Sequence, residues 1–254
     1  MEVDRLIEWN APWLAALRGL GPVLREADPR TALSAAARER GVCSGYGRPI
    51  EFGAAGAAGA TPYELHIART GQVPTRDNLH DLFNALVWLT YPRAKAALNA
   101  RQANEIEKDG VGPARGRVRD AATLIDESAL LLACADPEVA RALHERDWQR
   151  LLVDWRGRWG NDIVALPFGH ALLEKLVGPF KAITACVVPV ASAADADASA
   201  AAFVARGDLA PSLLPHLPVL GIPGWCAENA DPRFYADARV FRPRRSADPN
   251  PATL

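Results

Sequence analysis

Apolar and polar positions between Pro74 and Arg101 repeat with the period of an α-helix. Four apolar residues recur at i, i+3, i+4 and i+7 and predict one buried helix face: Leu79, Leu82, Phe83 and Leu86. Thr75 or Asp77 is placed to cap this helix, because a side-chain oxygen there can accept from free N–H groups of the first turn. Pro92 interrupts the helix and opens a second one, which continues to about Asn104.

The opposite face of the first helix carries short polar side chains. They are Asp77, His80, Asp81 and Asn84. A solvated helix face usually carries Lys, Glu, Arg or Gln, which form helices more readily. The same stripe continues into Trp88 and Tyr91, which are poorly suited to open water. The pattern favours a helix face that lines a pocket. A buried structural network and an ordinary solvated face are the alternatives.

A second polar group interrupts the apolar pattern between Asp120 and Cys134. Two apolar runs flank Asp126-Glu127-Ser128, which predicts a strand, a tight turn and a second strand, with a helix as the alternative for the second run. In a strand, Asp120 and Asp126 share a face, and carboxylates there could hold a divalent cation. Asp also favours turns, so a purely structural role for these residues is the competing interpretation.

His170 is the third candidate, at the start of a predicted helix over Ala171–Val177. His170 and Glu174 are four residues apart, so they share a helix face. The helix dipole lowers the proton affinity of a histidine at this end and favours the neutral imidazole that a metal ligand or base requires. The alternative is a histidine that is hydrogen-bonded in the core.

The rest of the pattern predicts further helices and one buried strand. Helices are predicted over 29–40 (capped by Asp28), from residue 137, and over 146–159, and the strand over 183–190. Residues 63–67 suit either a short strand or a helical turn. They lead directly into the helix of the Pro74–Arg101 segment, so Glu64 is a candidate pocket carboxylate by chain proximity, with an ordinary surface glutamate as the alternative. Residues 191–207 predict a surface helix or loop. The segment from Leu213 predicts an extended arm anchored by aromatic residues: Trp225, Phe234, Tyr235 and Phe241.

These elements predict an α+β fold, a helix-dominated single domain over residues 1–245 with a small, mainly antiparallel sheet. The expected strands lie near residues 63–67, 120–134 and 183–190. Residues 246–254 are expected to be a disordered tail. The Gly- and Ala-rich connection over 41–62 contains neither GxxxxGK[ST] nor GxGxxG, so we do not interpret it as a phosphate-binding loop.

Composition narrows the functional classes. The chain has 254 residues, of which 49% are hydrophobic and 23% charged, as in ordinary globular proteins. Its 29 basic and 30 acidic residues give a net charge of −1, so there is no strong nucleic-acid signal. One local basic run, over residues 108–119 and densest at Arg115–Arg119, could contact a phosphate-bearing partner or be an ordinary exposed loop.

Cysteine usage and hydropathy indicate the expected compartment. Cys43, Cys134, Cys186 and Cys226 are widely spaced, without the CxxC or Cys–His spacing of a structural zinc site. We therefore expect reduced thiols in a cytoplasmic protein. The segment MEVDRLIEW lacks the pattern of a signal peptide, and no run of 18 apolar residues predicts a membrane span.

Several stretches are similar to those of one bacterial family. The segment TPYELHIARTGQVPTRDNLHDLFNALVWLTYPRAKAALN resembles domain-of-unknown-function family 3025, as do RDAATLIDES, FGHALLEKLV, and the tail LPVLGIPGW with DPRFYADARVFRPRR. The resemblance covers most of the chain. It implies one intact soluble domain and adds weight to the polar residues inside these motifs, but it carries no activity. Where the family has DENG, this chain has Asp126-Glu127-Ser128-Ala129, which makes the turn there less certain.

The polar candidates together suit a His/Asp/Glu pocket. The candidate catalytic residues are His80, Asp81, Asn84, Glu127 and His170. The candidate metal ligands are His80, Asp81, Asp120, Asp126 and His170, for Mg²⁺, Mn²⁺ or Zn²⁺. Arg93 and Lys95 are weaker candidates. A His and a carboxylate could also act as base and acid without a metal, with Asn84 orienting a substrate oxygen.

Two functions fit these residues. The first is a metal-assisted hydrolase acting on a small-molecule or phosphorylated substrate. It requires the candidate residues to converge on one point. The alternative is a non-enzymatic domain that binds a ligand or another protein, with a pocket but no coherent acid, base or metal geometry. The sequence contains no HExxH, and the single His80-Asp81 pair is a weak signal. It contains no GxSxG and no cysteine with an obvious partner base, so covalent nucleophilic catalysis is disfavoured.

Overall fold

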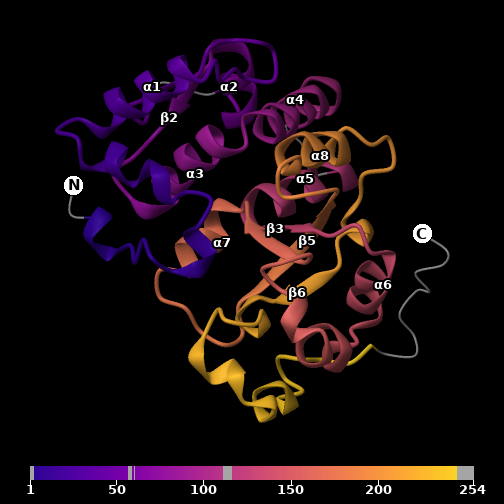
Figure 1. Ribbon diagram of the computed structural model, residues 1–254. Helices are drawn as coiled ribbons and strands as arrows, with labels where there is room; N and C mark the ends of the chain where they lie inside the picture. Colours follow the sequence, from indigo (N-terminus) through magenta and orange to yellow (C-terminus); the bar gives the residue numbers. More distant parts are fainter. Residues whose placement is uncertain (1–2, 57–58, 60, 111–115, 245–254) are drawn as a thin grey trace.

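The computed structural model describes residues 3–56, 59, 61–110 and 116–244 (Figure 1). The predicted α+β, helix-dominated fold class is confirmed. The α-helices are α1 Pro29–Glu39, α2 Tyr63–Thr70, α3 Leu79–Thr90, α4 Pro92–Asp109, α5 Arg117–Ser128, α6 Pro137–Glu145, α7 His170–Lys175 and α8 Ala196–Val204. The strands are β1 Glu51–Gly53, β2 Gln72–Pro74, β3 Ala129–Ala133, β4 Val164–Pro167, β5 Thr184–Val190 and β6 His216–Pro218. The predicted tail over 246–254 lies outside the described residues.

The larger sheet is mixed. Its strand order is β4-β3-β5-β6, with antiparallel pairing at both edges and a parallel pair, β3 with β5, in the centre. All five residues of β3 are buried, as expected for a strand covered on both faces. A separate two-stranded parallel sheet joins β1 and β2. Residues 63–67 belong to α2, so the expectation of a strand there, and of its place in the sheet, is wrong.

The segment before β3 is also a helix. The predicted strand, turn and strand over 120–134 is wrong in its first half, because α5 runs to Ser128 and Asp126-Glu127-Ser128 forms its last turn. Ala121, Ala122 and Ile125 are the buried apolar residues of this helix, at helical spacing. The remaining run, Ala129–Ala133, is short and apolar throughout and forms the strand. The alternative placed a helix after the turn, whereas the structure has the helix first, as α5, and the strand second, as β3.

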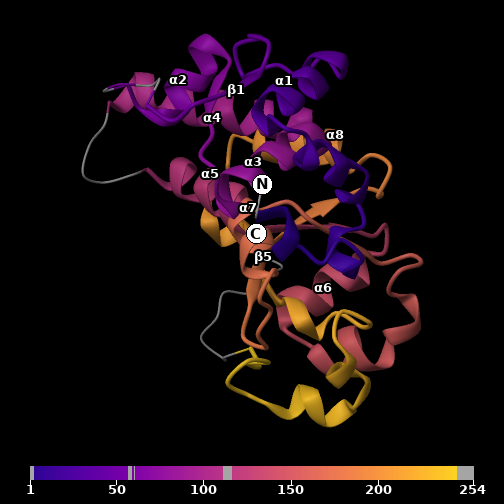
Figure 2. The ribbon, with the colours of Figure 1, turned by 90° about the vertical axis from the view of Figure 1, so that its left-hand side faces the viewer.

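The sheet divides the core into two clusters. Alternate residues of β3 face opposite ways, so Ala129, Leu131 and Ala133 join one cluster and Leu130 and Leu132 join the other. The first cluster is formed with helices α1, α3, α4, α5 and α8, and the second with α6 and the C-terminal segment. Figures 1 and 2 show these two groups at opposite ends of the molecule, with α7 between them.

Three further segments can be compared with their predictions. Residues 146–159 form a π-helical segment, Gln149–Asp154, and a 3-10 turn, Arg156–Arg158, in place of one α-helix. Their apolar residues are still largely buried, among them Trp148, Leu151, Leu152 and Trp159. Residues 191–207 contain α8, which buries Ala196, Ala200 and Val204 and packs against α4. The arm after Leu213 is anchored as predicted, with Trp225 and Phe241 buried and Phe234 and Tyr235 packed beside them.

The described helices include none whose length and apolar character would allow it to span a bilayer.

Candidate metal and acid–base site

Helix α3 presents the first histidine of the site. It begins at Leu79, and the side chain of Asn78 caps it by accepting from the backbone N–H of Asp81 at 2.8 Å. The cap is therefore Asn78, and the predicted Thr75 and Asp77 do not serve as caps. His80 lies in the first turn, with its side chain 34% exposed.

Gly169 allows the second histidine to approach the end of α5. Helix α7 begins at His170, directly after this glycine. A Cβ at Gly169 would lie 2.4 Å from the backbone nitrogen of Ser128 and 2.5 Å from the carbonyl oxygen of Glu127, so only glycine permits this close contact between the two chain segments. The contact brings His170, which is buried, beside Glu127.

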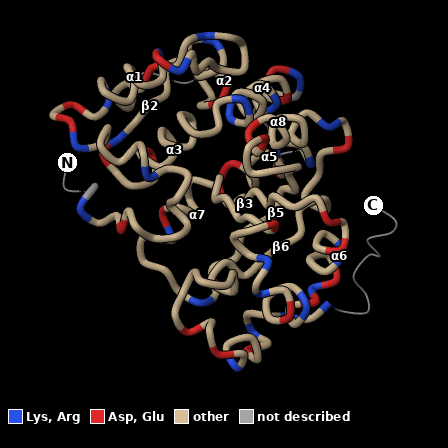
Figure 3. The backbone as a smooth tube through the Cα atoms, in the orientation of Figure 1, with Lys and Arg blue, Asp and Glu red and all other residues tan. Residues whose placement is uncertain are grey.

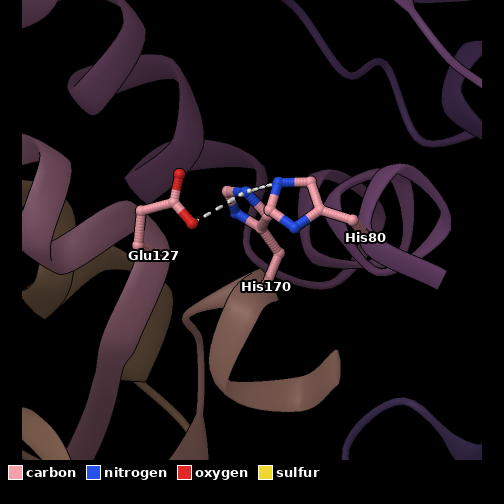
Figure 4. A group of neighbouring side chains, drawn as sticks. All are labelled: His80, Glu127 and His170. Carbon is pink, nitrogen blue, oxygen red and sulfur yellow. Dashed lines mark hydrogen bonds and ion pairs between the residues drawn. The ribbon is translucent and has the colours of Figure 1, made fainter. Parts of the chain in front are cut away.

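His80, Glu127 and His170 converge on one point from three helices (Figure 4). The Nε2 atoms of the two histidines are 3.0 Å apart, and Glu127 Oε2 is 3.6 Å from His170 Nε2. One ligand atom from each of the three residues lies within 4.8 Å of the others. Glu174, one turn along α7 from His170, places Oε2 2.9 Å from the Nδ1 atom of His80. The sequence placed Glu174 on the face of His170 without assigning it to the site.

The hydrogen-bonding of the two imidazoles fixes where their lone pairs lie. The Glu174 carboxylate can only accept, so the Nδ1 atom of His80 carries a proton, and a neutral His80 has its lone pair on Nε2. Burial lowers the pKa of His170, which favours the neutral form of this ring. Its Nδ1 is buried without a hydrogen-bond partner and lies 4.0 Å from Asp126 Oδ1.

A neutral His170 has one proton for two nitrogens, and either position leaves a conflict. With the proton on Nε2, it donates to His80, but the Nδ1 lone pair then faces the Asp126 carboxylate. With the proton on Nδ1, two Nε2 lone pairs face each other across 3.0 Å. A cation between the Nε2 atoms removes the second conflict and leaves the Nδ1 proton directed toward Asp126.

A buried lysine lies behind the histidines. Lys95 from α4 donates to Asp126 Oδ1 at 2.5 Å and to Asn84 Oδ1 at 2.8 Å, and Asn84 in turn donates to the Tyr63 hydroxyl at 3.1 Å. Burial acts to raise the pKa of Asp126, but Lys95 and His170 outweigh it and hold this pKa below its usual value. From the sequence, Lys95 was only a weaker candidate, because a lysine side chain is usually solvated. Its spacing of i, i+4 and i+7 with Asn99 and Gln102 on α4 was the available signal.

Glu64, at the start of α2, adds a carboxyl group with an altered proton affinity. Its Oε2 accepts from Asn99 Nδ2 at 2.8 Å. Burial, reinforced by the negative charge of Asp126, raises the pKa of Glu64 to about 7. A carboxyl group with this pKa exchanges protons at neutral pH, as a general acid or base requires.

Three of the predicted metal ligands lie outside the cluster: Asp81, Asp120 and Asp126, the last of which is paired with Lys95. Both oxygens of Asp81 bind Arg76, through its backbone N–H at 2.7 Å and its guanidinium at 2.9 and 3.0 Å, and these bonds lower the pKa of Asp81 although burial opposes them. Asp120 is exposed on α5. The argument that Asp120 and Asp126 share a strand face is wrong, because six residues on a helix turn through roughly 600° and point different ways.

The histidines and carboxylates open into a cavity of about 380 Å³. Its lining residues are Ala55, Tyr63, Glu64, Pro74, Arg76, His80, Asp81, Asn84, Asp126, Glu127 and His170. The polar stripe of α3 therefore lines a pocket through His80, Asp81 and Asn84, and Figure 3 shows acidic positions where α5 meets β3 inside the molecule. Within the basic run over residues 108–119, residues 111–115 lie outside the described part of the chain, and Arg119 belongs to α5.

Comparison with known proteins identifies the family. The family model described as a protein of unknown function (DUF3025) matches residues 52–245, which is more than half of the chain. None of the curated proteins and none of the solved structures matches the chain. The matched region contains every residue of the His80–Glu127–His170 cluster. The chain therefore belongs to the DUF3025 family of proteins of unknown function.

Proposed function

We propose that this protein is a metal-dependent hydrolase whose cation is held by His80, Glu127 and His170. The convergence of these three side chains on one point carries the proposal. Two histidines and one carboxylate are a ligand set of catalytic zinc sites, in which a further position stays open for water or substrate. The orientation of His80 by Glu174 matches the carboxylate–histidine–metal arrangement that fixes ligand tautomers.

The distances suit a first-row divalent cation. Metal–nitrogen bonds of about 2.0–2.1 Å in a tetrahedral site place two nitrogens roughly 3.3 Å apart. The two Nε2 atoms are 3.0 Å apart, so a small side-chain rotation is sufficient. Imidazole ligands favour Zn²⁺ over Mg²⁺, and the carboxylate also suits Mn²⁺. Among the three expected cations, Zn²⁺ and Mn²⁺ are therefore the better candidates.

The cation would polarise a substrate carbonyl or phosphoryl oxygen and lower the pKa of water at the site. Glu64 would exchange the proton, because burial raises its pKa to about 7 and it lines the same cavity. Asn84 would orient a substrate oxygen through its amide, held in place by Lys95 and Tyr63. Asp126 would face the Nδ1 atom of His170 across 4.0 Å, and Asp81 would hold Arg76 at the rim.

The first test separates metal binding from catalysis. Thermal stability is measured for chelator-treated protein with Zn²⁺, Mn²⁺ and Mg²⁺, for wild type and for His80→Ala, His170→Ala and Glu127→Gln. A cation at about 100 times its Kd stabilises the folded state by about 2.7 kcal/mol, and this gain should be absent in the three variants. Asp120→Asn, on the same helix as Glu127 but exposed, is the matched control and should keep the full gain.

The second test measures turnover. Wild type loaded with the stabilising cation is assayed against chromogenic phosphate esters, carboxylic esters and amides, with Glu127→Gln as the inactive control. A cation effect that persists in His80→Ala would place the metal elsewhere and overturn the proposal. Metal binding without hydrolysis of any class would favour the non-enzymatic binding domain, as would the absence of a stabilising cation together with the absence of turnover.

A further inference from the structure

A second chamber adjoins the candidate metal pocket. Its volume is about 290 Å³, and it shares four lining residues with that pocket: Tyr63, Glu64, Asp126 and Glu127. Five further residues line this outer chamber: Pro62, Gln102, Ile106, Arg119 and Thr123. The two chambers therefore adjoin at these four residues, which is the reason for considering them together as one site for a molecule bound at the histidines.

Two helices supply the polar wall of the outer chamber. On α5, Arg119, Thr123 and Glu127 follow one another at four-residue spacing, so they form a single stripe that ends at the metal cluster. On α4, Lys95, Asn99 and Gln102 form a comparable stripe, and α4 packs against α5. The two stripes run from the histidines outward to Gln102 and Arg119.

The inner and outer residues of these stripes differ in how their polar groups are paired. At the inner end, Lys95 makes two side-chain hydrogen bonds and Asn99 makes three. Arg119, Gln102 and Thr123, at the outer end, make no side-chain hydrogen bond or ion pair with the residues that the structure describes. Gln102 is only 8% exposed, and its amide atoms reach solvent through the chamber. Gln102 is the buried member of this set, and Arg119 and Thr123 are partly exposed, so the outer chamber offers three polar side chains that no other described residue engages.

The chemistry of the unpaired groups defines the ligand. A guanidinium offers five N–H donors in a planar fork, accepts nothing and is always charged, which suits the paired oxygens of a carboxylate or phosphate. Gln102 and Thr123 add an amide and a hydroxyl donor to the same wall. The nearby carboxylates do not cancel this preference, because Lys95 neutralises Asp126, a cation would neutralise Glu127, and burial raises the pKa of Glu64 to about 7, so that this carboxyl is only partly charged near neutral pH.

We propose that the outer chamber binds an oxyanion group, a carboxylate or phosphate, on a substrate whose reacting bond lies at the His80–Glu127–His170 cluster. This inference rests on the proposed hydrolase function, because it treats both chambers as one site. It specifies the substrate class as a small anionic molecule with its charge set apart from the bond that is cleaved. Arg119 is then a specificity-determining residue.

The test measures binding of defined anions. Succinate and inorganic phosphate are titrated by calorimetry into the full chain, with and without Zn²⁺, at up to about 10 mM, a range that detects a Kd near 1 mM. The variants are Arg119→Gln and Thr123→Val. Arg117→Gln is the matched control, because it removes the same charge two residues away on the same helix, from an exposed position that does not line the chamber.

The expected result is that wild type and Arg117→Gln bind at least one anion, and that Arg119→Gln binds it at least about tenfold more weakly, since a charge-assisted bidentate contact is lost. Thr123→Val should weaken binding by a smaller factor. Equal affinity in Arg119→Gln and Arg117→Gln, or no binding of either anion to wild type, would overturn the inference. Because the Zn²⁺-dependent thermal shift is recorded on the same variants, anion binding at Arg119 without any metal effect would support the chamber and remove the hydrolase.

Discussion

The Nε2 atoms of His80 and His170 lie 3.0 Å apart, although the residues are separated by 90 positions in the sequence. Their rings meet edge to face, with centroids 4.4 Å apart. Two neutral imidazoles gain little from this approach unless a proton or a cation lies between the nitrogens. Glu174 fixes the proton of His80 on the far nitrogen, so the near nitrogen is free to bind a cation. This geometry supports the proposed metal site.

Glu174 should control metal affinity without being a ligand. Glu174→Gln keeps the size of the side chain but removes the charge that orients His80, and loss of such a partner typically weakens metal binding by about 10–100-fold. Competition with a fluorescent zinc chelator measures the change. Glu145→Gln, an exposed substitution at the end of α6, is the control and should bind as wild type does. Unchanged affinity in Glu174→Gln would show that the carboxylate has no role at the site.

Gly169→Ala should damage both the fold and the cluster. The added methyl group would meet the backbone of Glu127, Ser128 and Ala129 at 2.4–2.6 Å, which neither segment can relieve by a side-chain movement. We expect a loss of about 1–3 kcal/mol in the free energy of unfolding, the range for overpacked sites, together with weaker cation stabilisation. Urea denaturation with and without Zn²⁺ measures both. Gly178→Ala, where nothing lies within 4 Å, should leave both quantities nearly unchanged.

Lys95 and Asp126 should behave as an energetic unit. The side chains are 4% and 11% exposed, so Lys95→Met would leave a buried carboxylate without its counter-ion, at a cost of about 3–5 kcal/mol in the free energy of unfolding. The double variant Lys95→Met/Asp126→Asn should recover part of this loss, because the unpaired charge is gone. Urea denaturation of both single variants and the double variant measures the coupling. Additive losses would contradict the pairing, and Lys108→Met at an exposed position of α4 controls for loss of a lysine.

Glu64 should make stability depend on pH near neutrality. Its pKa is about 7 in the folded protein and 4.5 as a model value, so between these values the folded state binds more protons than the unfolded state. The free energy of unfolding contributed by this group therefore falls as pH rises from 4.5 to about 7, and the loss is complete above that.

Glu64→Gln removes this dependence. In chelator-treated protein, its free energy of unfolding relative to wild type should increase across the same pH window, by a few kcal/mol at most. Chemical denaturation at several pH values between 4 and 8 measures the difference. A difference that stays constant with pH would mean that Glu64 has an ordinary pKa. Glu145→Gln, which changes an exposed carboxyl in the same way, is the matched control substitution.

Local spacing predicted the features that depend only on neighbouring residues. The apolar stripe of α3 is buried through Leu82, Phe83 and Leu86, and Pro29 and Asp28 start α1 as expected. Helical period alone places His80 and Asn84 on one polar stripe, and His170 with Glu174 on another, because 3.6 residues per turn fixes which side chains share a face. The family resemblance likewise depends on local motifs, and the family match confirms it.

Tertiary packing decided which of these faces meet. The sequence DAATLIDES was expected to form a strand and a turn, but in the structure it belongs to α5, which turns Glu127 toward the histidines and Asp120 away. The sequence favours a solvated Lys95, but in the structure this lysine is buried against Asp126, where α4 packs on α5. The sequence made Asp81 as plausible a metal ligand as the histidines, but in the structure its carboxylate is bound by Arg76. Short-range spacing sets the direction of a side chain, but its partner depends on contacts between distant segments, which no local pattern contains.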